Sequence, residues 1–125
     1  MMDSVFGALR FDVGWKTEID AALFGKARRV TVKARAYREE DGLTIEQESA
    51  FADYKSREEE IWKAAEKLLR DYMGGDCGTR FSPRTLLFER DGGYALLCDD
   101  EEYPDEGVAV ELAPRRRVML QDDYL

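Results

Sequence analysis

Residues 28–37 read RRVTVKARAY and residues 44–73 read TIEQESAFADYKSREEEIWKAAEKLLRDYM, and the change of apolar period between these two stretches decides the fold. In the first stretch, small apolar residues occupy every second position from Val30 to Ala36, which predicts a β-strand with one buried face. In the second stretch, aromatic and aliphatic residues recur at spacings of three and four, which predicts an amphipathic helix. The small side chains of the strand leave room for such a helix to approach closely.

The helical stretch carries its own start and stop signals. Thr44 and Gln47 form the Thr-x-x-Gln pattern of a capping box, in which each side chain satisfies a backbone N–H of the first turn. Residues 56–59 repeat the pattern, so the sequence leaves open one long helix, a kinked helix or a helix in two parts. The pair Gly74-Gly75 predicts the C-terminal end. The core is expected to receive three aromatic residues of this helix: Phe51, Trp62 and Tyr72.

Strand patterns flank the helix on both sides, and an Asp-Gly pair within residues 90–93 is typical of a β-hairpin turn. The order strands, helix, strands predicts a single α+β domain over residues 1–125. We expect a mostly antiparallel sheet of about six strands, with one long helix, straight or kinked, packed on one face. The strand patterns fall at 9–13, 15–19, 29–37, 85–89, 94–98, 108–112 and 118–120.

Composition limits the chemistry. The chain has 125 residues, 44% of them hydrophobic, which is enough for one core. It contains no histidine, and this excludes Ser-His-Asp triads, Cys-His dyads and histidine-ligated zinc. No apolar run approaches the roughly 20 residues of a membrane-spanning helix, and the first residues show no secretory signal pattern. We therefore expect a cytoplasmic protein that does not associate with membranes.

The two cysteines do not indicate a metal site. Cys98 lies in an apolar run and is expected to be a small buried hydrophobe. Cys77 lies in a glycine-rich loop, where a reactive thiol is the alternative to a structural one. Two cysteines without histidine leave none of the usual zinc ligand sets. The glycine pairs are typical of turns and not of phosphate loops, so we expect no metal, no cofactor and no catalytic residue set.

The most distinctive feature is the acidic segment, residues 99–106, which reads DDEEYPDE. Its carboxylates belong to Asp99, Asp100, Glu101, Glu102, Asp105 and Glu106. They make up most of the formal net charge of −8, and charge gathered in this way fits a surface that steers a basic protein partner. The alternatives are a solvated loop without a binding role and a divalent-cation site at Asp99, Glu101 and Asp105, although the residue spacing of a calcium loop is absent.

Basic residues gather elsewhere in the chain. Arg29, Lys33 and Arg35 share a strand face with Tyr37, a weak likeness to the basic and aromatic surfaces that bind single-stranded nucleic acid. The negative net charge disfavours such binding, and the same residues fit the solvated face of a half-buried sheet. A second basic run, residues 115–117, is expected in a loop between strands, where it could face the acidic segment.

Short motifs spread over most of the chain resemble a known family. They are Trp15 with Phe24-Gly25-Lys26, Thr44 with Gln47, Asp71 with Tyr72, Ala95-Leu96-Leu97-Cys98 and Gly107-Val108-Ala109-Val110. The family consists of small bacterial domains of unknown function, several of which are suspected immunity proteins of polymorphic-toxin systems. Its motif of tryptophan, acid and Glu-His-Gly corresponds here to residues 103–107, which contain neither tryptophan nor histidine, so no site is carried over. The resemblance implies an α+β fold and a bacterial source.

These observations favour a non-enzymatic, immunity-protein-like module that binds another, basic protein through the acidic segment. A small hydrolase or metal-dependent enzyme that relies on carboxylates alone is the alternative. Binding of single-stranded nucleic acid by the basic strand face is a third interpretation, and the three differ in the surface that each one uses.

Overall fold

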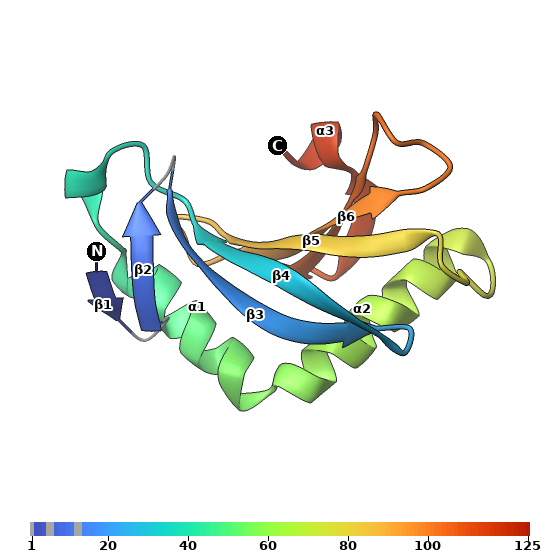
Figure 1. Ribbon diagram of the computed structural model, residues 1–125, viewed down its shortest axis with the longest axis horizontal. Helices are drawn as coiled ribbons and strands as arrows, with labels where there is room; N and C mark the ends of the chain where they lie inside the picture. The colour runs from blue at the N-terminus through green and yellow to red at the C-terminus, as the bar shows by residue number, and fades with distance from the viewer. Residues whose placement is uncertain (1, 5–6, 12–13) are drawn as a thin grey trace.

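The computed structural model describes residues 2–4, 7–11 and 14–125 (Figure 1). Asp12 and Val13, which end the first predicted strand, lie outside the described residues. In chain order the elements are β1 (Met2–Ser4), β2 (Gly7–Phe11), β3 (Trp15–Leu23), β4 (Lys26–Ala34), the short 3-10 helix η1 (Glu39–Asp41), α1 (Ile45–Ser56), α2 (Glu58–Met73), β5 (Phe81–Phe88), β6 (Tyr94–Asp100), β7 (Val108–Ala113), β8 (Arg117–Leu120) and α3 (Gln121–Tyr124).

The strands form one sheet whose spatial order follows the chain order from β1 to β8. Neighbouring strands are antiparallel except β4 and β5, which run parallel where residues 31–34 lie beside residues 85–88. The parallel pair exists because α1 and α2 carry the chain back along the sheet before β5 begins. The predicted α+β class with a mostly antiparallel sheet is therefore confirmed. The sheet has more strands than the six expected, and the sequence did not indicate the parallel pair.

Both long helices pack on one face of the sheet (Figure 1). On β4 the alternate positions Val30, Val32 and Ala34 are fully buried, as predicted. Phe51 and Trp62 are buried beneath the sheet, again as predicted, whereas 47% of Tyr72 is exposed, so its predicted place in the core is wrong. The core therefore lies between one sheet face and the helices.

The predicted long helix is two helices. Arg57 leaves the helical region with φ −127° and ψ 27°, which separates α1 from α2. Its guanidinium group bridges the two helices, 2.6 Å from Asp53 and 3.3 Å from Glu60. The second predicted capping box does not form, because the Ser56 hydroxyl donates to the Asp53 carbonyl at 2.8 Å instead. None of the helices in the described part of the chain is long and apolar enough to cross a membrane.

The first predicted capping box is confirmed at Thr44 and Gln47. The Gln47 N–H donates to the Thr44 hydroxyl and the Thr44 N–H donates to the Gln47 amide oxygen, both at 3.0 Å. The same Gln47 side chain is fully buried and donates to the carbonyls of Arg35, at 3.0 Å, and Phe88, at 3.2 Å. One glutamine thus caps α1 and also fastens it to the ends of the two parallel strands.

Candidate functional site

The acidic segment spans the end of β6 and the turn that leads to β7. Asp99 and Asp100 are the last residues of β6, and Gly107 precedes β7. The two aspartates differ because successive strand residues point to opposite faces. Asp100 is buried, with 4% of the residue exposed, whereas the Asp99 side chain is about half exposed.

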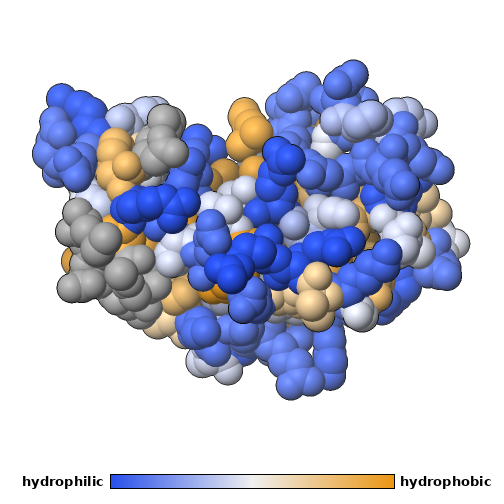
Figure 2. All heavy atoms as spheres, in the orientation of Figure 1, coloured by the Kyte–Doolittle hydropathy of each residue, from blue (hydrophilic) through white to orange (hydrophobic). Residues whose placement is uncertain are grey.

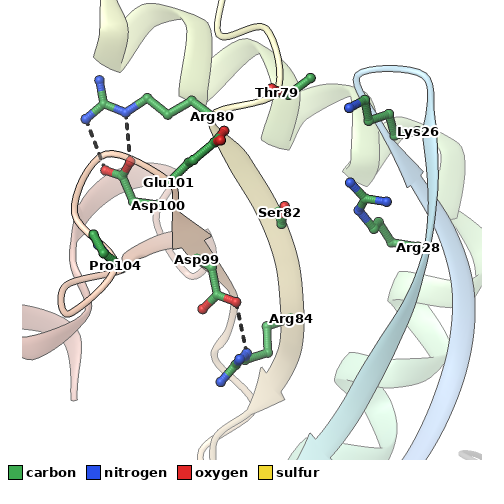
Figure 3. Close-up of a pocket in the computed structure, with 10 residues that line it drawn as sticks. All are labelled: Lys26, Arg28, Thr79, Arg80, Ser82, Arg84, Asp99, Asp100, Glu101 and Pro104. Atoms are coloured by element: carbon green, nitrogen blue, oxygen red, sulfur yellow. Dashed lines mark hydrogen bonds and ion pairs between the residues drawn. The ribbon is translucent and has the colours of Figure 1, made fainter.

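Arg80, just before β5, holds the buried aspartate. Its Nε lies 2.9 Å from Oδ1 of Asp100 and its Nη2 lies 3.0 Å from Oδ2, so the two groups form a paired, bidentate contact (Figure 3). Burial of Asp100 acts to raise its pKa, but the hydrogen bonds and charge of Arg80 and the backbone N–H groups of the turn outweigh burial and lower that pKa. Asp100 is therefore an ionised structural carboxylate and a poor general acid.

The same guanidinium group shapes the rest of the turn. Its Nη1 lies 2.8 Å from Oε2 of Glu102, and the group lies over the rings of Phe81 and Tyr103, 5.2 and 5.6 Å from their centroids. Backbone bonds complete the turn: the N–H of Glu102 donates to Oδ1 of Asp100 and the N–H of Tyr103 to its carbonyl. We call this arrangement around Arg80 the arginine clamp.

The clamp leaves part of the acidic segment free. Asp99 pairs with Arg84 at 3.1 Å, and both side chains are more than half exposed. Glu101, Asp105 and Glu106 are exposed and have no ion pair with any of the described residues. Of the six predicted contact residues, three are therefore engaged by the protein's own arginines and three point to solvent without such a partner.

A hollow of about 610 Å³ lies beside the turn. It forms because the β4–β5 ladder begins only at Thr31 and Thr85, so the earlier parts of both strands are not joined. Pro83 has no N–H to extend that ladder. Lys26 and Arg28 on β4 face Ser82 across this gap (Figure 3). Neither of these two basic residues forms an ion pair within the described parts of the chain. The hollow thus has a basic wall at Lys26 and Arg28. Its other side holds the carboxylates of Asp99, Asp100 and Glu101, of which the two aspartates are paired with Arg84 and Arg80.

Arg116 and Arg117 do not face the acidic segment, so for these two residues that expectation is wrong. Arg116 reaches Glu60 on α2 at 3.3 Å, and Arg117 pairs with the buried Glu111 on β7 at 2.7 Å. Arg80 and Arg84 do contact the segment, but the sequence does not single them out because neither belongs to a basic run: Arg84 lies on the neighbouring strand β5 and Arg80 immediately precedes it.

The basic strand face is largely neutralised. Arg29 contacts Glu18 at 3.1 Å and Asp20 at 3.2 Å, and Arg35 contacts Glu89 at 2.9 Å. Figure 2 shows a hydrophilic band over β3 and β4. Tyr37 is 83% exposed beyond the end of β4. This arrangement fits a solvated sheet face better than a track for phosphates.

In the described residues the two thiols are buried and the acidic side chains form no cluster of metal ligands. Burial raises the pKa of both Cys77 and Cys98, and neither is in a disulfide. The predicted alternative of a reactive Cys77 thiol finds no support, since a raised pKa disfavours the thiolate. Within residues 2–4, 7–11 and 14–125, no group of three or more acidic or cysteine side chains converges as metal ligands would, including Asp99, Glu101 and Asp105.

Comparisons with known proteins found no relative of this chain. No family model matches the chain, and neither a curated protein nor a solved structure matches it.

Proposed function

We propose that this protein is a non-enzymatic, immunity-protein-like binding module that docks a basic surface of another protein on its acidic segment. The observation that supports this proposal is the arginine clamp. It fixes the backbone of the turn through Asp100 and Glu102 while Glu101, Asp105 and Glu106 stay exposed. These three carboxylates take no part in the clamp and so remain available to a partner.

A turn held in one shape suits recognition for a physical reason. Little conformational freedom remains to be lost when a partner binds, so less of the contact energy is spent on ordering the turn. Two arginines offset only part of the charge of six carboxylates, so a negative field remains around the turn. Such a field speeds the encounter with a basic partner more than it tightens the final complex. Tyr103, 57% exposed, adds an aromatic ring of the kind enriched at interfaces.

The hollow beside the turn supports the same proposal. Lys26 and Arg28 offer positive charge on the wall opposite Asp99 and Glu101. A partner that places an acidic side chain next to its basic cluster would match both walls. Charge complementarity on two sides would fix the orientation of the partner as well as attract it.

The experiment needs a purified partner, obtained by affinity capture from the source organism and then prepared alone. We expect the variant Glu101→Gln, Asp105→Asn, Glu106→Gln to associate about tenfold more slowly at low salt than the native protein, with a weaker dependence of the rate on salt. Stopped-flow or biosensor kinetics measure both. The matched control is Glu39→Gln, Glu40→Gln, Asp122→Asn, which removes the same charge from exposed positions outside the acidic segment.

An equal loss of association rate in the control would show that the effect comes from net charge alone, and it would contradict a docking role for the turn. A stabilising shift of the melting temperature on adding Ca²⁺, Mg²⁺ or Mn²⁺, abolished by the triple variant, would instead favour the alternative of a carboxylate-dependent metal enzyme. Asp100 is left unchanged in both variants because its loss would disturb the clamp itself.

A further inference from the structure

Strand β3 has an open edge over most of its length. On one side it pairs with β4 from Trp15 to Leu23. On the other side β2 reaches only Trp15 and Lys16. Among the described residues, no strand pairs with residues 17–23 on that side, and Figure 1 shows β3 as the outermost strand there. An edge of this length presents backbone donors and acceptors that another extended chain can use.

The β3–β4 turn determines which backbone groups are free. Phe24 and Gly25 both have positive φ, 52° and 79°, as a two-residue type I′ hairpin turn requires. Leu23 and Lys26 therefore form the hydrogen-bonded pair that closes the turn, and bonding alternates from there along the strand. It follows that the N–H and C=O groups of Glu18, Asp20 and Ala22 point away from β4, toward the open edge.

The hairpin is fixed against α2 at its turn, which holds this end of the edge in place. The Phe24 N–H donates to Oε2 of Glu66 at 2.8 Å, and the Arg70 guanidinium lies 5.9 Å from the centroid of the Phe24 ring. A preformed edge spares an incoming strand the cost of ordering the template.

A groove of about 500 Å³ runs between the open edge and α2. Ala21 and Ala22 provide small side chains on the strand side, and Trp62 lies on the helix side. The charged lining is mainly acidic, with four carboxylates and one ammonium group: Asp20, Glu58, Glu59, Glu66 and Lys63. The groove therefore has room for side chains of an added strand and carries negative charge along it.

The existing ion pairs of this groove are exposed and exchangeable. Glu59 pairs with Lys63 at 3.0 Å and Glu58 with Lys55 at 3.0 Å, and each of these side chains is more than a third exposed. Exposed pairs of this kind contribute little to stability. An incoming basic side chain can replace either lysine at small cost.

The charge also argues against a second copy of this chain as the occupant. Antiparallel pairing of two β3 edges would set Glu18 and Asp20 of one copy against the same acidic strand of the other, and like charges across a strand pair are destabilising. A strand with lysine or arginine at every second position can instead direct these side chains toward the carboxylates of α2 that line the groove.

We propose that the open edge of β3, together with the groove beside α2, binds an extended basic segment of another protein by adding it to the sheet as a further strand. Backbone hydrogen bonds to Glu18, Asp20 and Ala22 supply affinity, and the carboxylates of Glu58 and Glu59 select basic side chains. This surface is separate from the acidic segment, so the two proposals stand or fall independently.

The probe is a synthetic peptide of alternating lysine and valine, as long as residues 17–23. Amide hydrogen exchange, followed by NMR on the isotope-labelled full chain, measures the protection of each backbone N–H along the edge. We expect the peptide to slow exchange at Glu18, Asp20 and Ala22, and to leave Ile19 and Ala21 almost unchanged because β4 already protects their amides. This alternation is a signature that non-specific charge attraction cannot produce.

Two control peptides and one pair of variants sharpen the test. The same peptide with N-methylated backbone amides, and a peptide with glutamate in place of lysine, should not protect the edge. Glu58→Lys with Glu59→Lys should weaken binding of the lysine peptide by about tenfold or more. The matched control, Glu39→Lys with Glu40→Lys, makes the same charge change at exposed positions outside both proposed surfaces and should leave peptide binding within about twofold.

Several results would overturn the proposal. They are equal protection by the glutamate or N-methylated peptide, absence of the alternating protection, and an equal loss of binding in both double variants. Sedimentation of the native protein as a dimer that Ala22→Lys dissociates would assign the edge to a second copy instead.

Discussion

Arg80 and Asp100 form the most enclosed ion pair of the acidic segment, with Nε–Oδ1 and Nη2–Oδ2 distances of 2.9 and 3.0 Å and only 4% of the Asp100 side chain exposed. The pair joins the start of β5 to the end of β6 and so fixes where the turn begins. Because the same guanidinium group also contacts Glu102 and Tyr103, the shape of the turn depends on this one contact.

Asp100→Asn should therefore loosen the turn and lower the free energy of unfolding by about 2 kcal/mol, the scale of a charge-assisted hydrogen bond. Urea unfolding measures the loss. Asp99→Asn is the matched control, because Asp99 is half exposed and its pair with Arg84 should contribute well under 1 kcal/mol. Equal losses in the two variants would contradict the special position of Asp100.

The pKa of Asp100 predicts how stability depends on pH. This pKa is lower in the folded protein than its ordinary value of 3.8, so the ionised side chain favours the folded state. Its contribution is complete above the ordinary pKa and is lost as pH falls through the lowered value. We expect Asp100→Asn to destabilise the protein near neutral pH and to matter progressively less as the pH falls below 3.8. Unfolding curves across this range test the sign, and a constant difference between the two proteins would refute it.

The acidic segment can be recognised in the sequence, but the arginine clamp cannot, because the clamp depends on the register between β5 and β6. Counting back from the turn at residues 90–93 places Arg80 near the acidic residues, so part of the signal was present. However, the ladder between β5 and β6 shifts register between Pro83 and Thr85. A bulge of this kind changes which residue lies opposite Arg80 and cannot be located from apolar alternation alone.

In the rest of the fold, too, the sequence predicts contacts between residues close in the chain better than contacts between distant ones. The Thr44–Gln47 capping box lies within one helical turn, and the sequence predicted it correctly. The break between α1 and α2 falls at Arg57, whose guanidinium group contacts Asp53 and Glu60. The pattern of residues 56–59 predicted a helix cap at Ser56 instead. Glu66 and Arg70, four residues apart on α2, both contact the distant Phe24. Tertiary packing decided each case that local pattern left open.

Substitutions at Gln47 measure how much its side chain stabilises the contact between α1 and the sheet. Gln47→Ala removes its capping bond and leaves the Arg35 and Phe88 carbonyls without this donor, so we expect a loss of about 2–3 kcal/mol in unfolding free energy. Gln47→Glu keeps an acceptor for the Thr44 N–H but cannot donate when ionised, and it should be at least as harmful. Chemical unfolding followed by circular dichroism measures both variants. A loss below about 0.5 kcal/mol for Gln47→Ala would show that the hydrogen bonds to the strand ends contribute almost nothing to stability.

The two thiols should be unreactive while the protein is folded. Burial raises the pKa of Cys77 and of Cys98, and the thiolate is the form that attacks an alkylating or disulfide reagent. We expect labelling with a thiol-specific chromogenic disulfide at neutral pH to be slow in the native state and to become fast in denaturant. Cys98, which is fully buried, should be the slower of the two. Rapid native labelling of Cys77 would revive a reactive role for the loop at residues 74–78.

Gly107 closes the acidic segment at a point with no room for a side chain. A Cβ at this position would lie 2.5 Å from the Cys98 carbonyl oxygen and also meet the Gln121 amide, which itself donates to that carbonyl at 2.9 Å. The Gly107 carbonyl in turn accepts the Gln121 N–H at 2.9 Å, so the turn, β6 and α3 meet here. Gly107→Ala must push β6 and the turn apart, and we expect it to cost about 1–3 kcal/mol of stability. Gly75→Ala, where an added Cβ meets nothing within 4 Å, is the matched control and should change stability by less than about 1 kcal/mol. If the Gly107 variant also binds the partner more weakly than its stability loss requires, the fixed shape of the turn, and not its charge alone, contributes to recognition.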